Sequence, residues 1–513
     1  MIAPLSEIRA SKSYWGVAVS VLIVYLLLAA GTAMSRRPWS DEGWFASPAY
    51  NLVNKGYMGT SILETVEPRG QQKGIDKYTY WIMPLDIVAQ AAWYKILGFG
   101  LFQMRMLSAA WGLLAILSWW VIVYTLSGDR KLALLTSSII AVDYAFMTGA
   151  SFGRMDMMCA ALSFAAFAAY LTFRERNFIA AIVVSQTLVV ASGLTHPYGI
   201  LGFAGLLFLT LYFDRKRVQP RHVVLALIPY VIGAVGWGLY ILQSPSLFLS
   251  QFIGNATAGA NYVGRLDGLT SPLTAFQREI SLRYLVAFGW GGHSAGSSSL
   301  ASLKILLLLT YLTGILGALF TRSIRTHRGF RSLLYLSGIY FLILTLVDGQ
   351  KLSWYLVHMI PLFAAVLAIF LNWLWINSRL PRWSIVALMS FFLMLQLGGM
   401  MLRIRQNSFQ KSYLPAANFL KTNASRSSLI MGSTELAFEL GFDANLVDDI
   451  RLGYYTGKKP DFIVVDEIYE DAFKGVGTQD LVVYQHVLDT LAKEYHPVYD
   501  HAFYKIYARN GSR

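Results

Sequence analysis

The chain alternates between long apolar runs and short polar segments. The apolar runs cover residues 15–34, 105–126, 132–149, 157–173, 178–194, 199–213, 223–242, 301–320, 332–347, 354–373 and 384–401. Most of them approach the length of about 20 residues with which an α-helix crosses the hydrocarbon core of a bilayer. The pattern predicts a polytopic α-helical membrane protein with about 11 transmembrane helices.

A shorter run over residues 82–98 has a different character. Its sequence PLDIVAQAAWYKILG places Asp86, Gln90 and Lys95 among apolar residues, as in an amphipathic helix that lies in the membrane interface. We expect juxtamembrane helices of this kind in the first outer loop, residues 35–104.

After residue 401 the pattern changes to that of a water-exposed domain. SSLIMG and DFIVVDE indicate short buried strands, TQDLVVYQHVLDTLAKEYH an amphipathic helix, and HPVYDHAFYKIYAR one or two closing strands. We expect a transmembrane domain over residues 1–401, followed by a small soluble α/β domain over residues 402–513.

The charges fall unevenly on the two sides of this topology. With 11 spans, the N-terminus and the loops on its side carry 16 basic and four acidic residues, whereas the first outer loop carries seven basic and six acidic residues. The positive-inside rule therefore places the N-terminus in the cytoplasm and the C-terminal domain on the exoplasmic face of an inner or plasma membrane. The net charge of +14 follows from this topology, and we expect no nucleic-acid partner.

Composition agrees with a membrane protein. Charged residues make up 14% of the chain and hydrophobic residues 55%, whereas soluble domains carry about 25% charged residues. The single cysteine, Cys159, lies in an apolar run. This excludes a disulfide framework and a metal cluster built on thiolates.

Polar residues gather at the outer ends of the predicted spans. Asp41 and Glu42 follow the first span in SRRPWSDEGWF, where they could cap a helix beginning near Gly43 or belong to a site. Position alone leaves both readings open.

Two further spans end in polar residues on the same side. Arg154 and Asp156 lie between the third and fourth spans, and His196 lies between the fifth and sixth. Arg154 and Asp156 could form a local ion pair, and His196 could be a polar turn residue. Charged groups near bilayer depth cost about 2.5–3.5 kcal/mol each, so they usually pair or serve a site.

The segment VDGQKLSWYLVHMIP adds a cationic group at the outer start of the tenth span. Lys351, Tyr355 and His358 are spaced i, i+4 and i+7, which predicts that they share one helical face. Lys351 could instead extend to the lipid headgroups. A stripe with no acidic partner beside it would suit an anion.

Carboxylates and a cationic stripe on one membrane face suit transfer from a lipid phosphate. The phosphate leaving group needs positive stabilisation, and an acceptor hydroxyl needs a general base. One carboxylate and one cationic clamp are enough for a single displacement with inversion at a sugar carbon.

The sequence resembles the GT-C fold membrane glycosyltransferases, and among them the branch of protein O-mannosyltransferases and lipid A aminoarabinose transferases. Four segments carry the resemblance in order: WSDEGWFASPAYNLV, MPLDIVAQAAWYKILGFGLFQMRMLSA with its Phe-Gly turn and Arg-x-x-Ser, GRMDMMCAALSFAAFAAYL, and KLSWYLVHMIPLFA. The resemblance implies a donor in which a polyprenyl phosphate carries the sugar, and a lipid, glycan or protein as acceptor.

The resemblance also implies roles for residues. Asp41 would be the general base, Glu42 its neighbour in the acidic pair, and Asp156 a second carboxylate that orients the acceptor or a cation. Lys351 and Tyr355 would bind the donor phosphate.

Other candidates are tied to the family less directly. We group His358 and Arg154 with the phosphate-binding residues. Relatives carry an acid and a lysine directly before the Pro-Leu helix, but here Asp76 and Lys77 stand several residues earlier. Together with His196, these two are candidates for an acceptor or cation site. A divalent cation on Asp41, Glu42, Asp156 and His196 stays open, because no tight ligand spacing is present.

Two other classes of protein must be weighed against the enzyme. A transporter or flippase of lipid-linked sugars would favour internal repeats and polar groups at mid-membrane depth; the sequence shows no repeat, and its polar residues gather at one face. A receptor or scaffold that binds a partner through its tail would leave the outer polar residues unexplained.

Overall fold

The computed structural model describes residues 12–64, 73–254, 267–289, 301–443 and 445–511. Its contacts divide the chain into two compact units. Unit 1 comprises Met1–Gly31, Ser108–Gly238 and Tyr262–Leu402, and unit 2 comprises Thr32–Leu107, Leu239–Asn261 and Arg403–Arg513.

Unit 1 is helical. It holds all or most of α1 (Lys12–Ser35), α4 (Leu101–Ser127), α5 (Arg130–Ala141), α6 (Tyr144–Ala150), α7 (Asp156–Phe173), α8 (Phe178–Thr195), α9 (Gly199–Asp214), α10 (Pro220–Ile241), α13 (Asp267–Thr270), α14 (Pro272–Arg278), η3 (Glu279–Leu285), η4 (Ala301–Lys304), α15 (Ile305–Phe320), α16 (Arg322–Thr326), α17 (Arg328–Val347), η5 (Ser353–His358), α18 (Ile360–Asn377) and α19 (Arg382–Gln406).

Nine helices within the described residues are long and apolar enough to cross a membrane, or ten if the bent pair α5 and α6 counts as one span. Helix α9 is a shorter apolar helix. Each of the apolar runs predicted as spans overlaps one of these helices or the bent pair. The chain is therefore an integral membrane protein, and the number of its spans stays a prediction.

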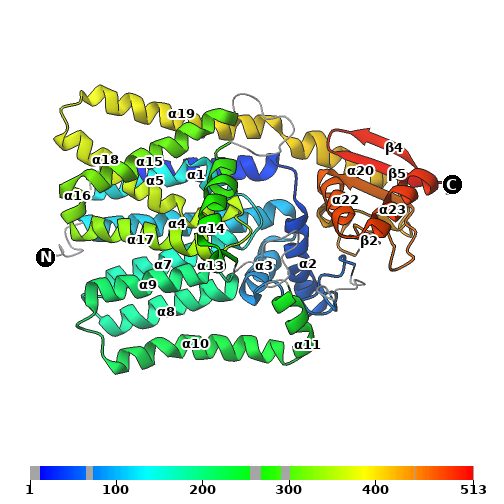
Figure 1. The fold of residues 1–513 in the computed structure, drawn as a ribbon, viewed down its shortest axis with the longest axis horizontal. Helices are drawn as coiled ribbons and strands as arrows, with labels where there is room; N and C mark the ends of the chain where they lie inside the picture. The colour runs from blue at the N-terminus through cyan, green and yellow to red at the C-terminus, as the bar shows by residue number, and fades with distance from the viewer. Residues whose placement is uncertain (1–11, 65–72, 255–266, 290–300, 444, 512–513) are drawn as a thin grey trace. The chain divides into compact units, whose positions relative to one another are not determined.

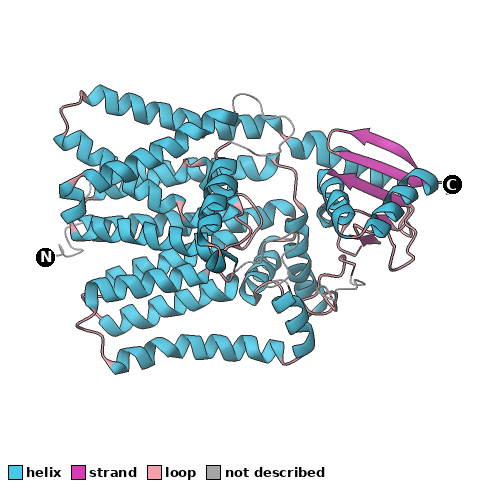
Figure 2. Ribbon diagram, viewed as in Figure 1, coloured by secondary structure: helices cyan, strands magenta, loops and turns pink. Residues whose placement is uncertain are grey.

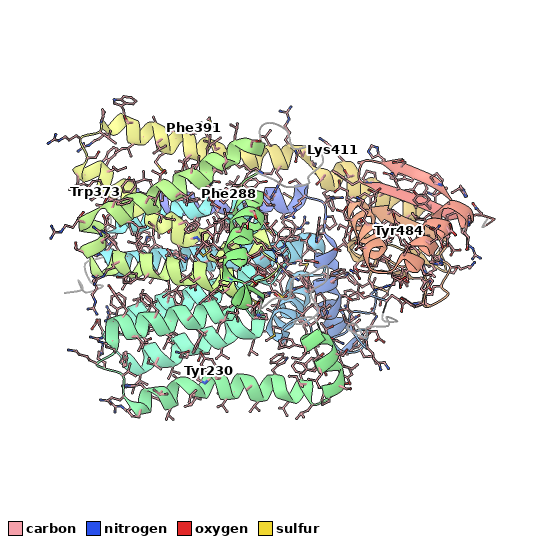
Figure 3. All side chains as sticks on the ribbon, in the orientation of Figure 1. Tyr230, Phe288, Trp373, Phe391, Lys411 and Tyr484 are labelled. Atoms are coloured by element: carbon pink, nitrogen blue, oxygen red, sulfur yellow. The ribbon has the colours of Figure 1, made fainter. Side chains whose placement is uncertain are left out.

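Small residues bring the helices of unit 1 close together. Helices α7, α8 and α9 pack against one another (Figure 1). A Cβ at Gly202 of α9 would lie 2.4 Å from Ser163 Oγ of α7, so the two helices meet where one has no side chain. Tyr230 of α10, labelled in Figure 3, donates a hydrogen bond of 2.7 Å to Gln186 of α8. Helix α10 otherwise exposes many large apolar side chains, as expected of a face that contacts lipid.

A buried carboxylate sits at the break between α5 and α6. Asp143 Oδ1 accepts a hydrogen bond from the Phe146 amide at 2.7 Å, which caps α6. Asp143 Oδ2 accepts from the Tyr311 hydroxyl and from Gln396 Nε2, each at 2.7 Å. The bend of 67° between the two helices is thus fixed by side chains from α15 and α19.

Unit 2 joins the first outer loop to the C-terminal segment. It contains α2 (Ser40–Lys55), α3 (Pro84–Leu97), α11 (Pro245–Phe248), η2 (Leu249–Ile253), η6 (Phe409–Tyr413), α20 (Leu414–Asn423), β1 (Ile430–Met431), η7 (Thr434–Leu436), α21 (Ala437–Leu440), β2 (Leu446–Val447), β3 (Phe462–Asp466), α22 (Glu467–Gln479), α23 (Leu481–Asp489), η8 (Thr490–Glu494), β4 (Tyr495–His501) and β5 (Tyr504–Arg509).

The named strands form one mixed sheet near the C-terminus, drawn in magenta in Figure 2. Their order is β2-β1-β3-β5-β4; β1 pairs in parallel with β2 and β3, and β5 pairs antiparallel with β3 and β4. The register places Val464 opposite Ile506. Buried residues of β1 and β3 pack against α22 and α23 in one core: Met431, Ile463, Val465, Tyr469, Phe473 and Val487. The predicted small α/β fold is confirmed.

The structure corrects the predicted tenth span. Residues 354–373 do not form one helix: η5 ends at His358, and α18 begins at Ile360 with Pro361 in its first turn. Proline has no amide hydrogen and fits the first turn of a helix but not its interior. The predicted helical face of Lys351, Tyr355 and His358 therefore does not exist.

Candidate functional site

The first candidate cluster lies at the start of α2, in unit 2. The helix begins at Ser40, so Asp41 and Glu42 occupy its first turn, where the helix dipole favours negative charge. Glu42 Oε2 accepts a hydrogen bond of 3.1 Å from the Trp39 amide. The capping interpretation is thus confirmed for Glu42.

Glu42 also forms a fully buried ion pair with Arg105 of α4. Arg105 Nε lies 2.7 Å from Glu42 Oε1, and Arg105 Nη2 lies 2.7 Å from Glu42 Oε2. Both side chains are 0% exposed. The same guanidinium donates to the carbonyls of Ala33, Arg36 and Arg37 at 2.7–3.1 Å. One side chain therefore holds both the end of α1 and the start of α2.

The two neighbouring acids at the start of α2, Asp41 and Glu42, have different surroundings. Arg105 engages both oxygens of Glu42, which fits a supporting place in the acidic pair, and the catalytic part predicted for Glu42 stays a prediction. Asp41 is half-buried on the same turn, so part of its surface can meet a substrate. The base function predicted for Asp41 stays a prediction.

The second candidate cluster lies in unit 1, where the α6–α7 connection faces the α8–α9 connection. Arg154 Nε donates to Asp156 Oδ2 at 2.7 Å, so the predicted local ion pair is confirmed. His196 Nε2 lies 3.9 Å from Asp156 Oδ1. The Tyr198 amide donates to His196 Nδ1 at 3.1 Å, and a neutral His196 therefore carries its proton on Nε2, toward Asp156.

Aromatic rings pack beside these polar groups. Tyr198 stacks on His196 with ring centroids 4.9 Å apart and meets the Tyr355 ring edge-on at 4.2 Å. The Arg154 guanidinium lies 5.7 Å from the Trp354 ring centroid. The aromatic residues of η5 thus join the Asp156 cluster to the Lys351 segment.

The structure overturns the expectation that Lys351 has no acidic partner. Lys351 Nζ lies 3.1 Å from Glu279 Oε2 and donates to the carbonyls of Leu344 and Thr345. Its side chain is 1% exposed, which also excludes the headgroup interpretation. Burial lowers the pKa of Lys351 and raises that of Glu279, and each charge opposes the shift of the other.

Glu279 belongs to a larger charge network. Arg283 Nη2 lies 2.5 Å from Asp348 Oδ2, and Arg283 Nε lies 2.8 Å from Glu279 Oε1. The network balances two cations against two carboxylates. Its Glu279 contacts are close but poorly aligned, because neither Glu279 oxygen has a donor in hydrogen-bond geometry. The Arg283 guanidinium also lies 5.6 Å from the Tyr355 ring centroid.

Several buried polar atoms of this region have unused hydrogen-bonding capacity among the described residues. They are Asp156 Oδ1, Arg283 Nη1 and both ring nitrogens of His358. Burial lowers the pKa of His358 to about 3, so its ring is neutral and offers one donor and one acceptor. Unpartnered buried polar atoms are costly unless water or a ligand satisfies them.

Asp76 and Lys77 lie in the turn between α2 and α3. Asp76 is half-buried and Lys77 exposed, and the Lys77 amide donates to the Gly74 carbonyl at 3.1 Å. Their part in an acceptor or cation site stays a prediction.

The residues of the second cluster do not fit a metal site. No group of three or more His, Cys, Asp and Glu side chains is gathered for an ion anywhere in the described part of the chain. Asp156 and His196 supply two ligands, and the Arg154 guanidinium already lies on Asp156 Oδ2. A resident cation usually has three or more protein ligands.

Among the charged residues of these clusters, the sequence analysis did not identify Arg105, Glu279 and Arg283. Arg105 stood in the Arg-x-x-Ser motif, but nothing in its spacing linked it to Glu42. Glu279 and Arg283 are spaced i, i+4 in REISLRYL, a charge pair inside a mostly apolar segment. That spacing was an available signal.

Comparison with known proteins adds the fold family. No protein-family model matches the sequence, and no curated protein matches it significantly.

ArnT from Cupriavidus metallidurans bound to undecaprenyl phosphate has a similar structure, with a TM-score of 0.60 and 16% identity over 98% of this chain and 99% of that one. The apo oligosaccharyltransferase of Archaeoglobus fulgidus has a TM-score of 0.55 and 13% identity over 98% of this chain and 75% of that one. The Archaeoglobus fulgidus oligosaccharyltransferase AglB, in complex with an inhibitory peptide and a dolichol-phosphate, has a TM-score of 0.52. The GT-C fold implied by the sequence resemblance is confirmed.

Proposed function

We propose that this protein is an inverting glycosyltransferase that moves a sugar from a polyprenyl-phosphate donor to an acceptor hydroxyl on the exoplasmic face of the inner membrane. The proposal rests on the different surroundings of two neighbouring carboxylates at the start of α2. Glu42 is locked by Arg105, and its neighbour Asp41 is left half-buried on a fixed helical turn. A carboxylate held in this way suits a general base.

In the proposed reaction, Asp41 takes the proton of the acceptor hydroxyl while that oxygen attacks the anomeric carbon. The bond between this carbon and the phosphate oxygen breaks, and its electron pair stays on the phosphate. A single displacement of this kind inverts the anomeric configuration.

The charge network of unit 1 supports a phosphate-binding role in a modified form. Lys351 and Arg283 form a cationic pair that Glu279 holds at short distance but with poor alignment. The donor phosphate would replace the Glu279 carboxylate on this pair, with Tyr355 beside it. Positive charge at this point stabilises the developing lipid phosphate.

The remaining polar groups suit the sugar. Asp156 Oδ1 and the neutral His358 ring offer acceptors and a donor in a buried setting, which is what sugar hydroxyls require. Arg154 holds Asp156 in place through its other oxygen, Oδ2. GT-C proteins bound to undecaprenyl phosphate or dolichol-phosphate make a polyprenyl phosphate the natural donor to test first.

The test combines cell-envelope chemistry with donor binding. A deletion strain is complemented with the native protein or Asp41→Asn, and its envelope glycans, lipids and glycoproteins are compared by mass spectrometry. We expect Asp41→Asn to lose the product while purified protein still binds undecaprenyl phosphate. Asp489, whose side chain is 45% exposed, provides the control, Asp489→Asn. Full product from Asp41→Asn would refute the base assignment. Purified protein that moves lipid-linked sugar across liposomes without transferring it would establish a transporter instead.

A further inference from the structure

A buried carboxylate of the C-terminal domain, Asp448, contacts α2. Asp448 Oδ2 accepts hydrogen bonds from Trp44 Nε1 of α2 at 2.9 Å and from the Thr434 amide and hydroxyl at 3.1 and 2.5 Å. Asp448 Oδ1 accepts from the Tyr469 hydroxyl of α22 at 2.8 Å. This carboxylate, 6% exposed, joins α2, η7 and α22 at one point.

The backbone of η7 lies directly on α2 beside the acidic turn. A Cβ at Gly43 would lie 2.6 Å from Thr434 C and 2.8 Å from Glu435 N. Such distances are too short for any side chain, so Gly43 is required for the contact. The contact falls two residues after Asp41.

The backbone of Asp448 also contacts the first outer loop. Its amide donates to the Ile62 carbonyl at 2.9 Å, and its carbonyl accepts from the Glu64 amide at 3.1 Å, around a parallel bridge between Leu63 and Asp448. The far end of α2 is held too, because Asp443 accepts from the Tyr50 hydroxyl at 2.8 Å and pairs with Lys55 at 2.6 Å.

We propose that Asp448 is a positioning residue of the enzyme: by holding Trp44 and Thr434 together, it sets the orientation of α2 and so the position of Asp41. The C-terminal domain thereby keeps the general base in position. This inference rests on the proposed function of Asp41. A carboxylate that accepts several aligned hydrogen bonds fixes a helix face in rotation as well as in distance, and small displacements of a reacting group are costly in rate.

The neighbouring residue Asp449 offers a matched control. It is buried as well, 4% exposed, but its oxygens accept from the Arg451 and Gly453 amides at 2.9 Å within its own turn. Asp448→Ala and Asp449→Ala each remove a buried carboxylate from the same segment, and the first also removes the bond to α2.

The experiment compares the two variants in the purified full-length protein. Three quantities are measured: the rate of transfer from an undecaprenyl-phosphate sugar to membranes of the deletion strain, the affinity for undecaprenyl phosphate, and deuterium uptake in residues 40–47. We expect both variants to lower the melting temperature. Asp448→Ala alone should lower the rate about 10- to 100-fold per folded molecule, increase uptake in α2 and leave undecaprenyl phosphate affinity unchanged.

Two milder variants keep the test decisive if Asp448→Ala does not fold. Trp44→Phe removes only the indole donor, and Asp448→Asn keeps one acceptor oxygen, so we expect a smaller loss of rate from each. Equal rates for the Asp448 and Asp449 variants, with equal uptake in α2, would overturn the proposal. Asp41→Asn is run alongside. If it retains turnover, the proposed function has failed; if it is inactive while Asp448→Ala matches Asp449→Ala, only the positioning role has failed.

Discussion

The Lys351 ammonium lies 3.1 Å from the Glu279 carboxylate, and both side chains are buried. Because Arg283 shares the same carboxylate, Glu279 occupies the place that an anionic ligand of the two cations would take. Under the proposed function, the donor phosphate would take the place of this carboxylate on the two cations.

Glu279→Gln should therefore strengthen the binding of undecaprenyl phosphate. The substitution keeps the size of the side chain and removes the competing charge, and we expect affinity to rise about three- to tenfold, equivalent to roughly 1 kcal/mol. Binding by purified protein is the measurement. Glu175→Gln, in a half-exposed surface ion pair with Arg174, is the control. Weaker binding by Glu279→Gln would mean that Glu279 supports the cations and that the phosphate binds elsewhere.

Breaking the Glu42–Arg105 pair should destabilise the protein strongly. Glu42→Gln leaves Arg105 charged and buried, at a cost of about 3–5 kcal/mol, which should appear as a marked fall in melting temperature. The exposed pair of Asp489 and Lys493, 3.0 Å apart, is the comparison, since exposed pairs contribute about 0–1 kcal/mol. Similar small losses from Glu42→Gln and Lys493→Ala would show that the Arg105 site is not closed to water.

The stability of the protein should fall as pH rises through the mildly acidic range. Burial raises the pKa of Glu435 well above its ordinary value and also raises that of Asp466 beside it. No donor among the described residues faces Glu435 Oε1 or Asp466 Oδ2, so a proton on Glu435 lets the two carboxyls bond. The folded state then holds a proton that the unfolded state loses above about pH 4.5, and stability decreases until pH passes the raised folded pKa.

Melting temperature measured from pH 4.5 to 8 tests this sign. Glu435→Gln should flatten the profile, because an amide donates without titrating. Glu494→Gln removes a half-exposed acid whose pKa is lowered by Lys459 and should leave the slope in place. A native profile that rises with pH would contradict the assignment of the proton.

Tyr311→Phe should loosen the break between α5 and α6. It removes the hydroxyl that donates to Asp143 Oδ2, and a lost hydrogen bond to a buried acid costs about 1–3 kcal/mol. Tyr335→Phe, on an exposed ring, is the control for thermal unfolding. Equal melting temperatures for the two variants would show that Gln396 alone satisfies Asp143.

The sequence predicted the membrane architecture well, because hydrophobic length is a property of single helices. DFIVVDE and HPVYDHAFYKIYAR were identified as strands for the same reason: alternation and apolar runs are local. Helix α22 was missed, since GVG at its end masks an amphipathic pattern. The helix predicted through Tyr355 and His358 was wrong because Pro361 was not weighed as a start signal.

The candidate site was only partly predictable from sequence. Asp41, Asp156 and Lys351 could be singled out because polar residues at the ends of apolar spans are conspicuous. The long-range contacts around them could not: Arg105 pairs with Glu42, Glu279 with Lys351 and Asp448 with Trp44, and each of these residues is distant in sequence from its partner. The wrong expectation that Lys351 has no acidic partner follows from this. The spacing of residues along one helix predicts only contacts within that helix, whereas the carboxylate of Glu279 comes from another element.

The bridge between Leu63 and Asp448 bears on how the molecule can be divided for study. A fragment beginning near residue 402 would keep every strand of the sheet and lose Trp44, Gly43 and Leu63, which together cover Asp448, η7 and the end of β2. Such a fragment would present bare backbone and an uncovered carboxylate to water, and its behaviour would say little about the same residues in the whole chain. The smallest informative piece of the C-terminal domain includes the first outer loop.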